Sequence, residues 1–208
     1  LRFDHMRYDY ENKLTTLETG SHRRPEDTDV EYQHLSPKLG ATYAINQHLN
    51  TFVSYRHAFR VPSQGQLFRQ VKSTNTVKVD NYEIGLRGNT DSKVNYEISV
   101  YYMVKNDDIL SFKHDDGSTE TMNAGQTLHQ GIEAGLTAPL HDDIDIAVSY
   151  AYTEFTYEDW KPNATIDYSD NQLEAAPRDI GNIALGYHPS QMNGGKVELE
   201  FVHLGQYW

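Results

Sequence analysis

Hydrophobic side chains recur at every second position in this chain, over stretches of about ten residues. The clearest stretch contains Val94, Tyr96, Ile98, Val100, Tyr102 and Val104. Polar residues such as Asn95, Glu97 and Ser99 lie between them. Successive side chains of a β-strand point to opposite faces, so this pattern predicts a strand with one apolar face. No comparable stretch has apolar residues at helical spacing, and the chain is predicted to be all-β.

The same pattern predicts about nine strands, over residues 1–10, 32–45, 49–60, 78–88, 93–105, 126–138, 143–156, 176–188 and 195–206. Short and long connections alternate between them. The short ones are 46–48, 89–92, 139–142 and 189–194, and the long ones are 11–31, 61–77, 106–125 and 157–175. Outer-membrane barrels have tight periplasmic turns and long extracellular loops. The alternation therefore predicts an antiparallel, up-and-down transmembrane β-barrel segment, and it argues against a soluble β-sandwich.

Composition limits the remaining classes. The net charge of −12 argues against a nucleic-acid partner, because phosphate binding needs a basic surface. The absence of Cys excludes disulfides and thiolate nucleophiles. The mean hydropathy of −0.71 is compatible with a barrel, whose strands alternate apolar and polar residues. The 15 Tyr residues suit a wall that meets both water and a lipid interface.

Several segments resemble the TonB-dependent receptors. Phe59-Arg60-Val61-Pro62-Ser63 looks like that family's Phe-Arg-Ala-Pro-Ser motif, and the preceding strand 52–58 matches its usual lead-in. Residues 77–87 are similar to the family's Tyr-Glu-x-Gly strand, although the usual Lys-Pro-Glu is replaced. Further likenesses are Asn123-Ala124-Gly125 with His129-Gln130-Gly131-Ile132-Glu133, and Pro177-Arg178 with Asn182. These landmarks follow the family order, which makes the resemblance fairly specific.

The resemblance implies that residues 1–208 belong to a 22-stranded barrel domain, with the plug and the C-terminal strands outside this sequence. Both ends look cut, so we expect a fragment. The resemblance also implies a receptor in the outer membrane of a Gram-negative bacterium, in contact with lipid and lipopolysaccharide. Such a receptor imports a ferric siderophore, an iron(III) chelate, and is energised by the TonB complex through the missing plug. We expect no cofactor bound by the protein itself. Import of haem, cobalamin or a glycan is the alternative, and a passive porin or an outer-membrane enzyme is a more distant one.

The long connection that follows Arg60 is basic. It carries Arg69 and Lys72, and no acidic residue occurs before Asp80. Arginine offers several donors to carboxylate or catecholate oxygens, so an anionic chelate is a suitable ligand. We therefore regard Arg60, Gln66, Phe68, Arg69 and Lys72 as candidate ligand-binding residues. The alternative is that these cations neutralise acidic neighbours or bind lipid phosphates.

Trp160 completes the candidate set, because an exposed aromatic ring can grip an apolar part of a ligand. The alternative, which we favour for Trp160 and Tyr157, is anchoring in the aromatic girdle at the membrane interface. Residues 114–120 are acidic but lack the spacing of a calcium loop, and we interpret them as a hairpin tip. The sequence contains no nucleophile elbow, phosphate loop or His-Glu-x-x-His motif, and we expect no catalytic or metal site.

Overall fold

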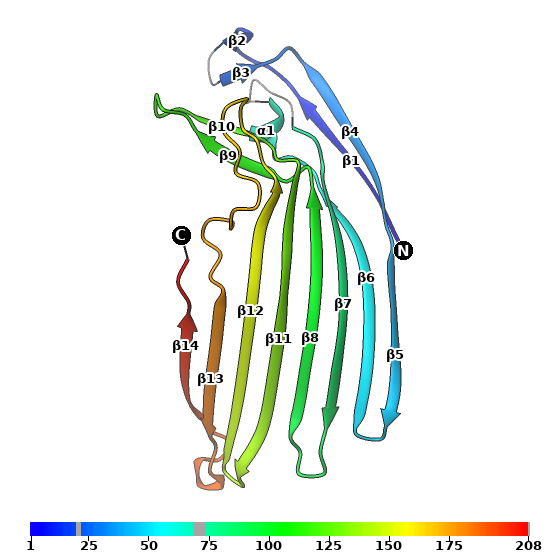
Figure 1. The fold of residues 1–208 in the computed structure, drawn as a ribbon, viewed down its shortest axis with the longest axis vertical. Coiled ribbons are helices and arrows are strands. Elements are labelled where there is room, and N and C mark those ends of the chain that lie inside the picture. The colour runs from blue at the N-terminus through cyan, green and yellow to red at the C-terminus, as the bar shows by residue number, and fades with distance from the viewer. Residues whose placement is uncertain (20–21, 69–73, 208) are drawn as a thin grey trace.

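The computed structural model describes residues 1–19, 22–68 and 74–207, and β-strands dominate it (Figure 1). The long strands are β1 (Arg2–Tyr10), β4 (Thr28–Ser36), β5 (Lys38–Asn46), β6 (Leu49–Arg60), β7 (Val77–Asn89), β8 (Asn95–Asn106), β11 (Gln126–His141), β12 (Ile144–Asp159), β13 (Asp179–Tyr187) and β14 (Val197–Leu204). The helices are α1 (Gln64–Phe68) and η1 (Ser190–Met192). Among the described residues, no helix is long and apolar enough to cross a membrane.

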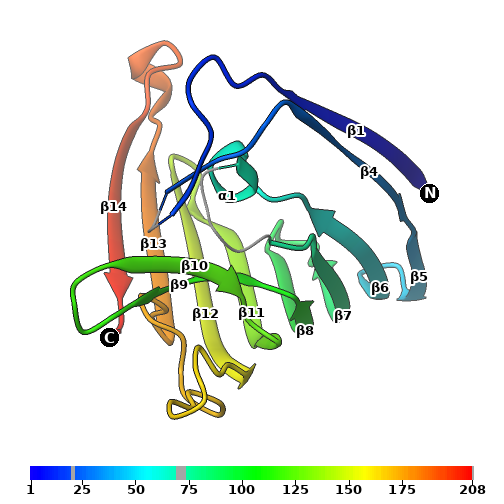
Figure 2. The same cartoon turned by 90° about the horizontal axis from the view of Figure 1, so that it is seen from above.

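Eight strands form one antiparallel sheet in the order β14-β13-β12-β11-β8-β7-β6-β5. Each strand pairs with its neighbours along the chain, apart from the small hairpins in the loops. The hairpin β1–β4 adjoins this sheet at the β5 end and is paired separately. Seen from above, the strands follow an open arc with α1 on its concave side (Figure 2). The predicted antiparallel meander is therefore confirmed, as a segment of wall that does not close into a barrel.

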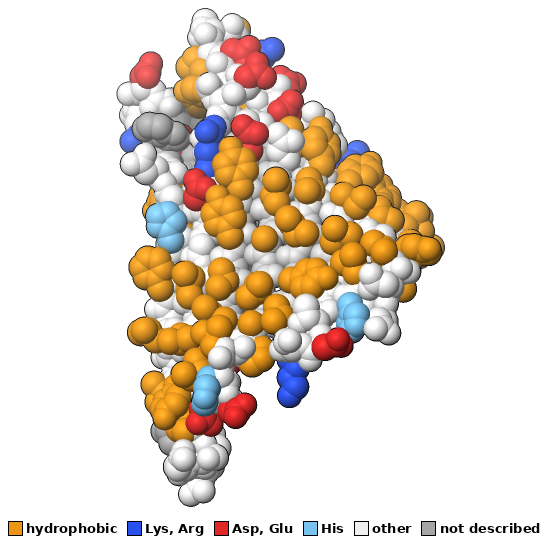
Figure 3. Space-filling view, turned by 60° about the horizontal axis from the view of Figure 1, so that its bottom comes forward, with side chains coloured by type: hydrophobic (Ala, Val, Ile, Leu, Met, Phe, Trp, Pro, Cys, Tyr) orange, Lys and Arg blue, Asp and Glu red, His pale blue; other side chains and the backbone are white. Residues whose placement is uncertain are grey.

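The two faces of the sheet differ in chemistry, as the alternation predicts. Register places Val53 opposite Ile84, Ile84 opposite Val100 and Val100 opposite Ile132, so all four lie on one face. All four are exposed, and hydrophobic side chains form a broad band across this convex face (Figure 3). We call it the outer face. The intervening residues, including Glu97 and Ser99, lie on the concave inner face.

All the short turns lie at one end of the sheet and the long connections at the other (Figure 1). Two of these long connections contain small hairpins, of which the sequence analysis anticipated only the tip at residues 114–120. They are β2 (Leu17–Thr19) with β3 (His22–Arg24), and β9 (Ile109–Lys113) with β10 (Thr119–Asn123). The predicted sorting of the loops is confirmed, but the loops are more ordered than predicted.

One predicted strand is divided in the structure. Residues 32–45 were expected to form a single strand, but β4 ends at Ser36 and β5 begins at Lys38. Pro37 lies between them. It has no N–H to contribute to a ladder, although its carbonyl still accepts a hydrogen bond of 3.0 Å from the His57 N–H. β4 then pairs with β1, whereas β5 pairs with β6. The proline therefore separates the β1–β4 hairpin from the wall.

Buried hydrophobic residues gather at the loop end rather than within the sheet. They are Phe68, Val77, Ile109, Phe112, Ala124, Leu128, Trp160 and Ala176. The wall itself has an apolar outer face and a polar inner face, so it has no sandwiched core of its own. The loops consequently supply the packed interior of this segment.

Candidate ligand-binding site at the loop end

Asp108 is the centre of a charged cluster at the loop end of the inner face. Its carboxylate lies 3.5 Å from Nη2 of Arg60 at the end of β6 and 3.9 Å from Nζ of Lys105 near the end of β8. It also accepts hydrogen bonds from the Thr127 hydroxyl at 3.2 Å and from the Ile109 N–H at 3.0 Å. Residues from three strands and one hairpin therefore converge on a single carboxylate.

Register explains why these side chains meet. Lys105 is the cross-strand partner of Thr127, so both point to the inner face. Arg60 lies on the same face as Arg56 because the two are four positions apart on β6, and Arg56 pairs with Glu83 there. Asp108 follows β8 directly and turns back towards the ends of these strands. Two cations therefore share one carboxylate, and Arg60 remains half exposed with its side chain 53% accessible.

A buried hydrogen-bond chain supports the cluster from below. Thr127 is fully buried and His129 is 5% exposed. Because the Thr127 hydroxyl donates to Asp108, its oxygen is left to accept from Nε2 of His129, 3.2 Å away. The proton of His129 is therefore on Nε2. These hydrogen bonds hold the Asp108 carboxylate in place, and Arg60 is its most accessible partner.

The β9–β10 hairpin is tied to the same place. The Ala124 N–H donates to the Asp108 carbonyl, and the Asp107 N–H donates to the Gly125 carbonyl at 3.1 Å. Asn123 extends the connection, because its Oδ1 accepts from the Asn75 N–H at 2.7 Å. Residues on both sides of β7 and β8 are therefore linked across the loop end.

Trp160 lies in the small core that joins two long connections. It packs with Phe112 and Ala124 of the β9–β10 segment, and Leu110, Met122, Tyr157 and Ile166 pack around them. Trp160 is only 4% exposed, so the expectation of an exposed ring is wrong. The burial of Trp160 also argues against its anchoring in a membrane girdle, whereas for Tyr157, which is partly buried with its ring centroid 6.4 Å from that of Trp160, the girdle interpretation stays a prediction. Packing against residues distant in the sequence buries Trp160, although its acidic neighbours along the chain suggested an exposed ring.

The remaining candidates lie in or beside α1. Phe68 is buried and stacks on Tyr10 with ring centroids 4.7 Å apart. Gln66 folds back onto the start of the helix, where its Oε1 accepts from the Ser63 N–H at 2.8 Å. Arg69 and Lys72 lie outside the described residues. Of the predicted set, the structure places Arg60 in the charged cluster, and ligand contact by any of them stays a prediction.

The sequence analysis missed Lys105, Asp108, Thr127 and His129. The inner-facing positions of Lys105, Thr127 and His129 on two strands were visible, but Asp108 lies in the connection after β8, and the register that brings the strand ends together was not visible. The 114–120 segment was interpreted correctly as a hairpin tip, with the His114 N–H donating to the Ser118 carbonyl at 2.8 Å. In that tip, the hydroxyl and N–H of Ser118 donate to Asp116 and lower the pKa of its carboxyl. Within the described ranges, no cluster of three or more His, Asp or Glu is arranged to hold a metal ion.

Nearer the turns, the inner face forms an open polar groove of about 540 Å³. Its polar lining is Asn50, Arg87, Asn95, Glu97, Thr137, Ser149 and Asn182. These side chains alternate with the outer-face residues of six neighbouring strands, β6, β7, β8, β11, β12 and β13. The inner face therefore offers hydrogen-bonding groups along the wall, below the charged cluster.

Comparison with known proteins identifies relatives of this chain. All of it, residues 1–208, matches the family described as TonB dependent receptor-like, beta-barrel. Over 136 residues it is 21% identical to the ferric-pyoverdine M114 receptor PbuA of Pseudomonas sp. (strain M114), covering 65% of this chain and 16% of the receptor. The chain thus spans about a sixth of the length of this curated relative.

Solved structures share the fold. The copper transporter OprC superposes with a TM-score of 0.66 at 19% identity, over 80% of this chain and 26% of that protein. The FrpB iron transporter from Neisseria meningitidis (F5-1 variant) gives 0.60 at 16% identity, over 87% and 28%. The ferric yersiniabactin uptake receptor FyuA from Yersinia pestis gives 0.59 at 16% identity, over 77% and 24%. At these identities the likeness shows the fold alone.

Proposed function

Because this chain belongs to the TonB-dependent receptor β-barrel family, we propose that its full-length protein is an outer-membrane transporter that imports a ferric siderophore. The family consists of outer-membrane transport receptors rather than enzymes. The proposal adds the cargo, the energy supply from the TonB complex, and a plug domain outside this sequence. It is supported by a curated relative that is a ferric-pyoverdine receptor.

The charged cluster is the observation on which the choice of cargo rests. Arg60 and Lys105 point into the concave side, and the basic connection with Arg69 and Lys72 begins directly after Arg60. The chain as a whole is acidic, with a net charge of −12. A basic mouth on an acidic protein concentrates anions there and orients them towards the lumen. Carboxylate and catecholate oxygens of an iron(III) chelate are suitable partners for the half-exposed guanidinium.

Two other surfaces support the location. The apolar band of the outer face matches the lipid-facing surface of an outer-membrane barrel. We propose that it contacts lipid, with lipopolysaccharide above it on the loop side. The polar groove of the inner face suits the plug, because its amide and hydroxyl groups bind a folded polar domain better than lipid. On this proposal the long connections are extracellular.

The test is growth of an iron-limited Gram-negative host that lacks its own siderophore receptors and expresses the full-length protein. Single iron(III) chelates of different net charge are supplied one at a time. We expect growth on at least one anionic chelate, and no growth in a host without TonB. Growth on haem alone would show that the cargo is haem rather than a siderophore. Uptake without TonB would show that the proposed energy supply is wrong.

The residues are tested by measuring affinity for the chelate that supports growth, at two salt concentrations. A triple Arg60/Arg69/Lys72→Ala variant should bind more weakly and with a smaller salt dependence, because charge attraction is screened over about 10 Å at 0.1 M salt. A Lys38/Lys93/Lys196→Ala variant removes the same charge away from the loops. It should keep nearly normal affinity, which separates a local effect from one of net charge.

A further inference from the structure

We propose that His34 and His57 form an acid-sensitive latch between β4 and β6. The hydrogen bond between the two rings persists when the neutral pair takes up one proton and breaks when it takes up a second. Nε2 of His34 lies 2.9 Å from Nε2 of His57. The ring planes are 21° apart and the centroids are separated by 5.0 Å. Two imidazoles joined edge to edge by an in-plane N–H···N hydrogen bond have this geometry. The latch is independent of the transported cargo.

A carboxylate beside the other ring nitrogen of His57 determines where this ring carries a proton. Nδ1 of His57 lies 2.8 Å from a carboxylate oxygen of Asp80, its cross-strand partner on β7. The Tyr55 hydroxyl donates to the same carboxylate at 2.7 Å. An ionised carboxylate only accepts hydrogen bonds, so Nδ1 of His57 carries a proton. The hydrogen bond between the two rings therefore joins their Nε2 atoms.

Counting protons gives the behaviour of the latch. In the neutral pair, one Nε2 carries a hydrogen and the other accepts it. A first added proton goes to a ring nitrogen without disturbing this bond, because one Nε2 still donates and the other still accepts. A second added proton places an N–H on both Nε2 atoms, which then point at each other with like charge. The hydrogen bond is replaced by repulsion, and the two strands lose this link.

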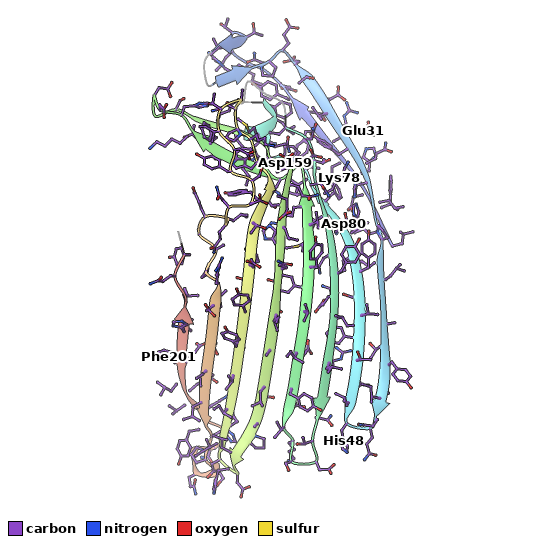
Figure 4. All side chains as sticks on the ribbon, viewed as in Figure 1. Glu31, His48, Lys78, Asp80, Asp159 and Phe201 are labelled. Carbon is purple, nitrogen blue, oxygen red and sulfur yellow. The ribbon has the colours of Figure 1, made fainter. Side chains whose placement is uncertain are left out.

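Charged groups of β1 and β7 lie beside the pair. Asp4 of β1 is the cross-strand partner of His34, Lys78 of β7 lies close enough to act on the His34 ring, and Asp80 of β7 is paired with His57. Figure 4 shows Lys78 and Asp80 near the loop end of β7. Because two positively charged rings repel each other, the second proton is added to the pair at a lower pH than the first.

The position of the latch gives it mechanical importance. Pro37 interrupts the strand between β4 and β5, and the β1–β4 hairpin pairs separately from the wall. His34 reaches back from this hairpin to His57, and its ring also stacks on Phe59 at a centroid distance of 4.1 Å. Opening the latch removes one link between the end of β4 and the wall and leaves the hydrogen bond from the His57 N–H to the Pro37 carbonyl. Histidine is the side chain whose ordinary titration falls between about pH 5 and 8.

The experiment is hydrogen–deuterium exchange of the full-length receptor in detergent between pH 8 and 4.5. Exchange times are scaled for the intrinsic effect of pH, and protection of β4 amides is compared with that of β12 in the same molecule. We expect the β4/β12 protection ratio to fall about tenfold in acid, the effect of losing a charge-assisted hydrogen bond. A constant ratio, including a parallel loss in both strands, would overturn the proposal.

Two variants identify the cause. In His34→Gln the amide donates to or accepts from Nε2 of His57 in either protonation state, so the ratio should stay high in acid. In His188→Gln, which alters a histidine beside Asp145 at the opposite end, the acid response should persist. If His34→Gln responds to acid as the wild type does, the latch is excluded.

Discussion

The ring of Phe52 on β6 covers Gly85, its direct cross-strand partner on β7. A Cβ at Gly85 would lie 2.6 Å from Cε1 of Phe52 and 2.7 Å from the carbonyl oxygen of Ile98. The guanidinium of Arg87 lies over the Phe52 ring, 5.3 Å from its centroid. The missing side chain of one residue thus makes room for the aromatic ring of the other on the inner face.

Replacing Gly85 with Ala should lower the free energy of unfolding by about 1–3 kcal/mol, because backbone must move to accept the methyl group. The matched control is Gly135→Ala, also on the inner face, where an added Cβ meets no atom within 4 Å. The measurement is denaturant unfolding of the full-length receptor in detergent or lipid. Equal losses from the two substitutions would contradict the close packing at Gly85.

A Lys at Ile98 should lower the free energy of unfolding in lipid vesicles by about 2–4 kcal/mol, as expected for a cation at the bilayer midplane. Ile98 lies in the outer apolar band and is 45% exposed there. The adjacent Glu97→Lys substitution places the same side chain on the polar inner face and should cost far less. A comparable loss from Glu97→Lys would mean that the two faces have been assigned in reverse.

Removing the Asp108 carboxylate should release the β9–β10 hairpin, because Thr127 and the Ile109 N–H lose their buried acceptor. We expect Asp108→Ala to cost about 1–3 kcal/mol in local stability. Asp108→Asn keeps an acceptor oxygen and should retain most of the protection. Hydrogen exchange of residues 106–125 measures the difference, and equal protection in wild type and Asp108→Ala would exclude the anchoring role.

Trp160→Ala should separate the two connections that share its core, at a cost of about 3–5 kcal/mol for a buried large side chain. Limited proteolysis should then cut the 106–125 and 157–175 segments while the strands remain resistant. The neighbouring Lys161→Ala substitution removes an exposed side chain and should leave these segments protected. Unchanged cleavage of the Trp160 variant would show that the core is not needed for loop order.

The candidate site depended on long-range geometry that no local pattern contains. Arg60 was identified because it begins a basic connection, which is visible along the chain. Asp108 was not, because its role requires the ends of β6, β8 and β11 to meet. Trp160 shows the opposite error, since its acidic neighbours suggested exposure but packing against Phe112 buries it. Side chains far apart in sequence decide both outcomes.

The sequence by itself determined the strands, their two faces and the sorting of short turns from long connections. These features follow from side-chain alternation and turn residues, which act within a few positions of the chain. The tertiary structure alone decided that Pro37 separates β4 from β5, and that His34 meets His57 beyond this break. It also decided which charges share Asp108. Strand register and loop packing set these contacts, because they bring together atoms whose separation along the chain carries no local signal.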